Sequence, residues 1–134
     1  MITVETIVSN QLNKVWDAWT NPEHIIKWNF ASNDWHCPKA ENDLRKDGKF
    51  SYTMAAKDGS FSFDFWGTHT NIEESKLIET ILGDGRKMKV TFTEENGGVK
   101  VIEDFEPENE NPIDLQKTGW QAILNNFKKH VESL

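Results

Sequence analysis

The stretch "KFSYTMAAKDGSFSFDFWGTHTNI", residues 49 to 72, contains two runs of alternating apolar and polar residues on either side of Asp58-Gly59. Alternation with a period of two is typical of a strand that buries one face, and an Asp-Gly pair favours the positive φ angles of a tight hairpin turn. The stretch therefore predicts an antiparallel hairpin with strands from Lys49 to Ala56 and from Phe61 to Ile72. Its buried face is expected to carry the apolar residues of both strands, namely Phe50, Tyr52, Met54, Phe61, Phe63 and Phe65.

The same signals recur on both sides of this hairpin. Asp84-Gly85 and Asn96-Gly97 separate further alternating runs, and Asp47-Gly48 offers another turn before the hairpin. The expected strands outside the hairpin are Ile2 to Ser9, Pro38 to Arg45, Lys76 to Leu82, Lys87 to Glu94 and Val99 to Glu106. The pattern predicts an α+β fold with a curved antiparallel sheet of about six to seven strands and one apolar face.

A long C-terminal helix is expected to cover the apolar face. It follows the acidic loop "EPENEN", residues 106 to 111, and is predicted from Pro112 to about Ser133, with Asn111 as N-cap and Pro112 in the first helical position. Its apolar stripe consists of Trp120, Ile123, Phe127, Val131 and Leu134.

Two short helices are expected between the first strand and the meander. Leu12, Val15, Trp16 and Trp19 follow a helical period, and Ser9 or Asn10 could cap that helix. We assign Trp16 and Trp19 to its packing stripe, and not to a ligand site.

The second short helix is predicted from Pro22 to Trp28. Thr20 and Glu23 have the spacing of a capping box, with Pro22 in the first turn. For Trp28, at the end of this helix, two interpretations remain open: it forms a lid over a cavity, or it is a plug in a filled core.

The composition limits the function classes. The 134 residues fit one domain, residues 1 to 134, and the net charge of −7 argues against nucleic-acid binding, which needs clustered Lys and Arg. No apolar run approaches the length of a membrane helix, and no N-terminal targeting segment is evident. The single Cys37 fits a reducing compartment, so we expect a cytoplasmic protein that does not bind membranes.

The pair His36-Cys37 is the first candidate for chemistry. Pro38 favours an extended backbone at Cys37, where neighbouring side chains point to opposite sides, so the thiol and the imidazole cannot easily pair. The other histidines are far apart in the chain. We therefore expect no catalytic residues, no metal site and no cofactor, with Cys37 as a small buried or half-buried group.

Four blocks of the sequence resemble a known family. They are "VWDAWTNPEHIIKW" at 15 to 28, "DLRKDGKF" at 43 to 50, "FDFWGTHTNI" at 63 to 72 and "GWQAILNNFKKHV" at 119 to 131. They look like the signature blocks of the family named after the activator of heat-shock-protein-90 ATPase, within the START/Bet v 1-like (SRPBCC) helix-grip superfamily. The resemblance implies a sheet wrapped round the C-terminal helix, with a cavity that in relatives takes lipids, sterols or polyketides.

The chain departs from the family pattern at two places. Asp47-Gly48 stands where the family has paired glycines, and His69 stands where it commonly has Tyr. The first departure is a change within a turn. The second would place an ionisable group on the cavity wall.

The parity of the strands indicates which side chains face the cavity. Glu103 shares parity with Val99, Val101 and Phe105, which points it inward, where it would need His69, Arg45 or Tyr52 as a partner. A β-bulge that turns Glu103 out to solvent is the alternative. The predicted ligand-binding residues are Trp28, Tyr52, Phe63, Phe65, His69, Phe92, Glu103, Trp120, Ile123 and Phe127.

Three functions remain open at this stage. The first is binding of a small hydrophobic ligand between the sheet and the long helix, without catalysis. The second is a protein-interaction module of the chaperone-ATPase-activator type, although the eukaryotic activators carry another domain ahead of this one. The third, ranked lowest, is a cyclase- or hydrolase-type enzyme. A monomer or weak dimer is expected.

Overall fold

The computed structural model describes all 134 residues as one sheet of seven strands and three helices. In chain order the elements are β1 (Ile2–Val8), α1 (Leu12–Thr20), α2 (Pro22–Trp28), β2 (Trp35–Asn42), β3 (Lys49–Ala56), β4 (Ser62–Glu73), β5 (Leu77–Leu82), β6 (Lys87–Glu95), β7 (Gly98–Phe105) and α3 (Ile113–Glu132). The predicted α+β class and order of elements are confirmed.

The sheet is antiparallel throughout, in the order β1-β7-β6-β5-β4-β3-β2. The predicted hairpin is β3 and β4, in which Tyr52 lies opposite Phe65. Gly59, Gly85 and Gly97 in the predicted turns all have positive φ angles, which glycine adopts without steric cost. At the far edge β1 pairs with β7, with Val4 opposite Glu103.

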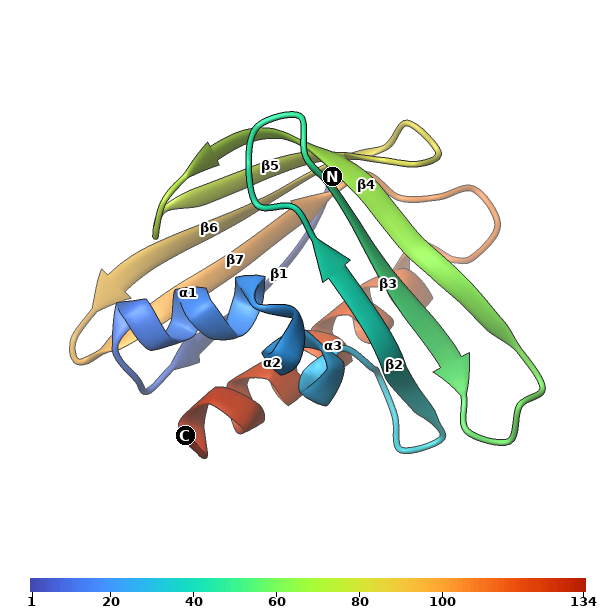
Figure 1. Ribbon diagram of the computed structural model, residues 1–134, viewed down its shortest axis with the longest axis horizontal. Coiled ribbons are helices and arrows are strands. Elements are labelled where there is room, and N and C mark those ends of the chain that lie inside the picture. Colours follow the sequence, from blue (N-terminus) through green and yellow to red (C-terminus); the bar gives the residue numbers. More distant parts are fainter.

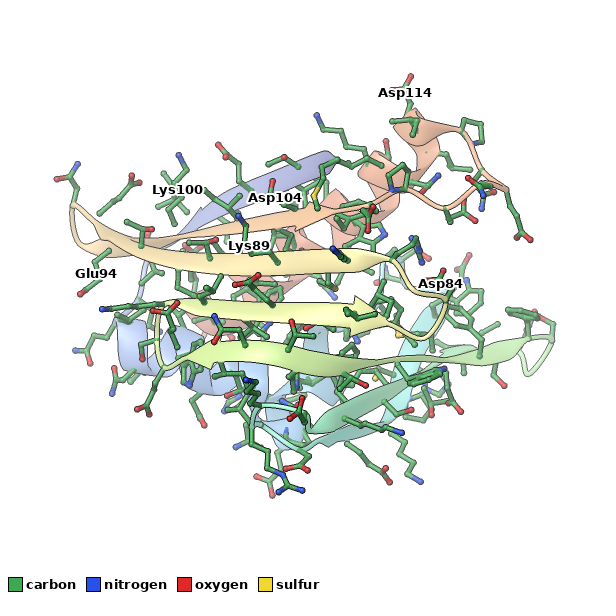
Figure 2. The ribbon with its side chains drawn as sticks, turned by 90° about the horizontal axis from the view of Figure 1, so that it is seen from above. Asp84, Lys89, Glu94, Lys100, Asp104 and Asp114 are labelled. Atoms are coloured by element: carbon green, nitrogen blue, oxygen red, sulfur yellow. The ribbon has the colours of Figure 1, made fainter.

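The two faces of the sheet differ in chemistry. The sheet curves over the three helices, and α3 lies along its concave side (Figure 1). On the opposite side Lys89, Lys100 and Asp104 stand on the outer face of β6 and β7 (Figure 2), where Lys89 lies opposite Asp104. The inner positions of β7 are Val99, Val101, Glu103 and Phe105, all of them buried. The charged outer face leaves the concave face as the site of the core.

The helices are held together by side-chain hydrogen bonds to main-chain groups. α3 packs most closely along β1, and α2 packs on β2. Asn126 of α3 donates its side-chain NH₂ to the Trp28 carbonyl over 2.9 Å, which fixes the end of α2. None of the three helices is long and apolar enough to cross a membrane.

The predicted N-cap of α2 is wrong. Asn21, and not Thr20, caps α2, because its side-chain oxygen accepts the Glu23 main-chain N–H over 3.0 Å. Thr20 is the last residue of α1, and its hydroxyl donates to the Trp16 carbonyl. Proline at position 22 occupies the first turn as predicted.

The other helix starts are displaced by about one residue. Gln11 is the N-cap of α1, without a side-chain hydrogen bond, so neither Ser9 nor Asn10 caps it. The Asn10 side chain instead donates to the Val131 carbonyl at the end of α3. Pro112 is the N-cap of α3 in place of Asn111, and Ile113 is the first helical residue.

Two strand predictions need correction. β2 starts at Trp35 and ends at Asn42, not at Pro38 and Arg45, because it continues antiparallel to the far end of β3, with Trp35 opposite Ala56. Phe61 and Phe63 are 58% and 45% exposed. They lie near the turn between β3 and β4, where these strands extend away from the helices (Figure 1).

A pair of histidines joins α2 to α3. His24 Nδ1 lies 2.9 Å from His130 Nε2, and His24 Nε2 lies 3.3 Å from a carboxylate oxygen of Asp17. The arrangement fits His130 donating to His24, which donates to Asp17. Burial lowers the pKa of His130 below its usual value, and the nearby His24 and Lys27 lower it further.

The His130 contact is expected to weaken in acid. Its pKa is lower in the folded than in the unfolded chain, so its contribution to stability is present above about pH 6.5 and is lost as the pH falls. His130→Gln keeps a donor for His24, so it should lose less stability than the wild type between pH 7 and pH 5. Urea unfolding of variant and wild type measures this difference, with His36→Gln as the control. An equal loss in both proteins would contradict the prediction.

Candidate ligand-binding cavity

An apolar cavity of about 150 Å³ lies between the sheet and the helices, and 12 of its 17 lining residues are hydrophobic. Every helix and every strand except β1 contributes at least one side chain. The lining residues are Trp19, Trp28, Asn29, Asn42, Phe50, Tyr52, Met54, Phe63, Phe65, His69, Ile78, Thr80, Met88, Val90, Glu103, Trp120 and Ile123.

Trp28 forms one wall of this cavity. Its indole N–H donates to the Ala18 carbonyl over 2.9 Å, and its ring centroid lies 5.0 Å from that of Trp19. Only 3% of Trp28 is exposed to solvent, so it is a buried part of the cavity wall and not a plug that fills the space. Trp19 packs against Phe92 and Phe127 as expected, and it also lines the cavity. Trp16, in contrast, contacts Phe92 in the core as expected.

Two predicted lining residues belong to the filled core instead. Phe92 is covered by α1, with its ring centroid 5.2 Å from Trp16 and 5.9 Å from Trp19. Phe127 is fully buried between Trp19 and Trp28, at 4.9 and 4.8 Å. Both face inward as the periodicity indicates, but neighbouring rings fill the space in front of them. The other eight predicted residues line the cavity.

His69 is held as a neutral group in the cavity wall. Its Nε2 lies 2.7 Å from Asn42 Oδ1, and its Nδ1 lies 3.4 Å from the Thr80 hydroxyl. Because Asn42 Oδ1 can only accept, Nε2 carries the proton and Nδ1 accepts from Thr80. Burial lowers the pKa of His69, partly offset by Asp43. Its polar atoms are therefore already engaged within the protein.

Glu103 points into the same cavity, and only 5% of it is exposed. β7 keeps an unbroken register with both neighbouring strands, so no β-bulge turns Glu103 outward. The register shifts of the sheet lie elsewhere, between His69 and Asn71 of β4 and between His36 and Lys39 of β2. Burial alone raises the pKa of the Glu103 carboxyl to about 8, with no neighbouring charge or hydrogen bond to offset it.

The predicted partners of Glu103 are not its partners. His69 pairs with Asn42 and Thr80, and Arg45 pairs with Asp43 at the surface. Tyr52 shares the cavity but makes no hydrogen bond to Glu103. No fully buried side-chain nitrogen or oxygen lacks a partner, so the Glu103 oxygens are open to the cavity space and not sealed in the core.

Tyr52 and Cys37 carry two further reactive groups, a hydroxyl and a thiol. Burial raises the pKa of both the Tyr52 hydroxyl and the Cys37 thiol, so both are protonated at neutral pH. The Cys37 thiol donates to the Lys39 carbonyl over 3.4 Å, which fits its expected structural role. No cluster of three or more His, Cys, Asp or Glu side chains is placed to hold a metal ion.

An aromatic cluster continues from the cavity to the surface. Phe63 lines the cavity and is half-exposed, and its ring centroid lies 6.2 Å from Trp35 and 6.0 Å from Phe61. The cavity therefore reaches solvent beside the β3–β4 turn. Phe61, predicted to lie on the buried face, is instead exposed outside this mouth.

Sequence reasoning missed nine lining residues, for two different reasons. Seven of them lie on the same strand face or helix stripe as predicted residues, so the pattern indicated their face but not whether they border empty space. They are Trp19, Phe50, Met54, Ile78, Thr80, Met88 and Val90. Asn29 and Asn42 lie at the ends of α2 and β2, where neither period applies. The placement of the helices separates lining residues from filled core.

A curved antiparallel sheet round a long C-terminal helix, with an apolar cavity between them, defines a helix-grip protein of the START/Bet v 1-like class. The family model described as "Activator of Hsp90 ATPase homolog 1-like protein" matches residues 10–132. The chain therefore belongs to the family of Activator of Hsp90 ATPase homolog 1-like proteins. The predicted family resemblance is confirmed.

Solved structures of similar proteins agree with this assignment. The AHSA1-like protein from Aeromonas hydrophila is 40% identical, with a TM-score of 0.90 over 98% of this chain and 93% of that one. A protein from Cytophaga hutchinsonii is 50% identical, with a TM-score of 0.85 over 98% and 92%. A protein from Chromobacterium violaceum is 20% identical, with a TM-score of 0.86 over 98% and 96%, which supports the fold alone. No protein with a curated description matches the chain.

Proposed function

We propose that the protein binds a small apolar molecule in the cavity between the sheet and α3, without chemical conversion. The observation that carries this proposal is the cavity itself, about 150 Å³ in volume and lined mostly by hydrophobic side chains. An enclosed apolar cavity of about this volume can hold one benzene molecule. The family and the fold are compatible with a ligand-binding or interaction module.

The volume narrows the class of ligand. Pockets for drug-sized ligands usually measure about 300–1,000 Å³. A cavity of about 150 Å³ fits a single aromatic ring or a short branched chain better than an intact sterol. A longer ligand would have to leave part of its body at the mouth, beside Phe63 and Trp35, which are already an aromatic surface.

Apolar contact alone supports only weak binding of such a small ligand. Burial of its surface contributes about 25 cal/mol per Å², and the lost freedom of association offsets much of this. A physiological ligand therefore needs a polar contact as well. Glu103 and the Tyr52 hydroxyl are the lining groups best placed to supply one.

Toluene binding tests the proposal. Titration followed by protein NMR is expected to show saturable shifts at Tyr52, Phe65 and Trp120, which line the cavity. Ile123→Trp places a larger side chain in the cavity and should abolish these shifts. Ile26→Trp, a matched change at an exposed site on α2, should leave them unchanged.

Either of two results would refute the cavity as the binding site. One is the absence of any saturable shift in the wild type. The other is equal toluene affinity in Ile123→Trp and the wild type, with both proteins shown to be folded by their amide spectra.

A further inference from the structure

The cavity lining contains an acidic group but no basic group. Its lining residues include one carboxyl group, on Glu103, and no Lys or Arg. Seven of the seventeen are Trp, Tyr or Phe. A ligand that enters thus meets aromatic rings and one acidic group, without a basic side chain.

The Glu103 carboxyl lacks a hydrogen-bond partner within the protein. The Glu103 residue is 5% exposed, its carboxyl has no hydrogen-bond partner, and it lines the cavity. Its neighbours across the strands are Val4 and Val90, which offer no donor. A buried polar group without a partner is costly, so a donor supplied by a ligand would be strongly favoured here.

The other polar groups of the lining are largely occupied. His69 bonds to both Asn42 and Thr80, and the side-chain NH₂ of Asn42 donates to the Thr20 carbonyl. The Trp28 N–H is donated to Ala18. These bonds leave the Glu103 carboxyl and the Tyr52 hydroxyl as polar groups that a ligand can contact.

We propose that the cavity selects an organic cation, a protonated amine on a small apolar body, whose nitrogen binds the Glu103 carboxylate. The aromatic walls support this choice, because a cation near a Trp or Tyr ring is attracted to the face of that ring. This inference rests on the proposed function and specifies its ligand class. A carboxylate ligand such as a fatty acid is disfavoured because the lining holds no basic partner, and above about pH 8 the ionised Glu103 would also repel it.

The binding of such a cation is coupled to a proton. In the empty protein Glu103 is mostly protonated at pH 7, because burial raises its pKa to about 8. An ammonium ion that binds the carboxylate therefore displaces that proton to solvent. The other titratable groups in the lining are His69 on β4 and Tyr52 on β3, while α1, α2 and α3 contribute only Trp and Ile to it.

Benzylamine, benzyl alcohol and benzoate form a matched set of probes of nearly equal size. At pH 8.5 benzylamine is expected to bind about tenfold more tightly than benzyl alcohol, as for a charge-assisted hydrogen bond, and benzoate should bind weakest. Between about pH 6 and pH 8 the benzylamine affinity should rise by about tenfold per pH unit, while benzyl alcohol affinity should not rise.

Glu103→Gln tests the contact directly. The variant should lose about tenfold in benzylamine affinity at pH 8.5 and keep benzyl alcohol affinity within about twofold. Glu94→Gln, at an exposed position of β6, should leave both affinities unchanged. Calorimetry or NMR titration at several pH values measures these affinities.

Three outcomes overturn the inference while the proposed function stands. They are equal affinity for benzylamine and benzyl alcohol at pH 8.5, tight binding of benzoate, and an unchanged benzylamine affinity in Glu103→Gln. If toluene and all three probes fail to bind, both the proposed function and this inference are wrong. The pH series on the wild type keeps the test independent of the variant's stability.

Discussion

Glu103→Gln is expected to be more stable than the wild type at pH 8.5, by several kcal/mol, and close to it at pH 5. The reason is the burial of the carboxyl without a partner, which raises its pKa from 4.5 to about 8. A raised acid pKa means that the folded chain holds its proton more tightly than the unfolded chain. Between about pH 4.5 and pH 8 the wild type therefore loses about 1.4 kcal/mol of stability per pH unit, and Gln removes this loss.

Unfolding of both proteins in urea at five or more pH values gives this difference. Urea is preferred over guanidinium, because guanidinium is itself an organic cation that could occupy the cavity. Glu94→Gln is the matched control and should follow the wild type. A stability difference between Glu103→Gln and the wild type that stays constant from pH 5 to pH 8.5 would show that the carboxyl titrates normally.

Other residues at position 103 would avoid the stability cost of the buried carboxyl. Gln would fit the same space and could hydrogen-bond without a charge, and Val or Leu would extend the core around Val101 and Phe105. Buried groups with strongly shifted pKa values are found more often at functional sites than elsewhere. Contact with the proposed ligand cation in the cavity would offset this cost.

The sequence predicted the fold well because its signals are local. The alternation in β3 and β4, the glycines of the turns and the helical stripe of α3 each define one element, and the antiparallel order follows from the short connections between them. The errors at Thr20, Asn10 and Asn111 have one cause. Several cap-forming residues stand side by side there, and only the path of the chain decides which of them is the cap.

The cavity was predicted less completely than the fold, because its position depends on where the packed side chains leave empty space. Parity placed both Glu103 and Phe92 on the inner face, and it could not show that Trp16 fills the space at Phe92 while Glu103 borders a void. Likewise, Trp19 and Phe127 both lie on apolar helix stripes, yet only Trp19 reaches the cavity. Side-chain packing between distant segments decides these cases, and no single period in the sequence encodes it.

Phe127→Ala is expected to lower the free energy of unfolding by about 3–5 kcal/mol, as for a large ring removed from a filled core. Phe127 is fully buried, and its ring contacts both Trp19 and Trp28, so its loss leaves a hole where α1, α2 and α3 meet. Phe65→Ala should cost less, because one side of Phe65 already borders the cavity and fewer contacts are lost. Leu115→Ala, at an exposed position of α3, should change stability by less than about 0.5 kcal/mol.

For toluene binding the order is reversed: a substitution at Phe65 should have a larger effect than one at Phe127. Phe65→Ala removes part of the cavity wall and should alter the affinity for toluene, whereas Phe127→Leu, a milder change that keeps the chain folded, should leave it nearly unchanged. Urea unfolding and the NMR titration, run on the same samples, separate the two effects. Equal weakening of toluene binding by Phe127→Leu and Phe65→Ala would contradict the assignment of Phe127 to the filled core. In that case Phe127 would shape the cavity indirectly, through its contact with Trp28.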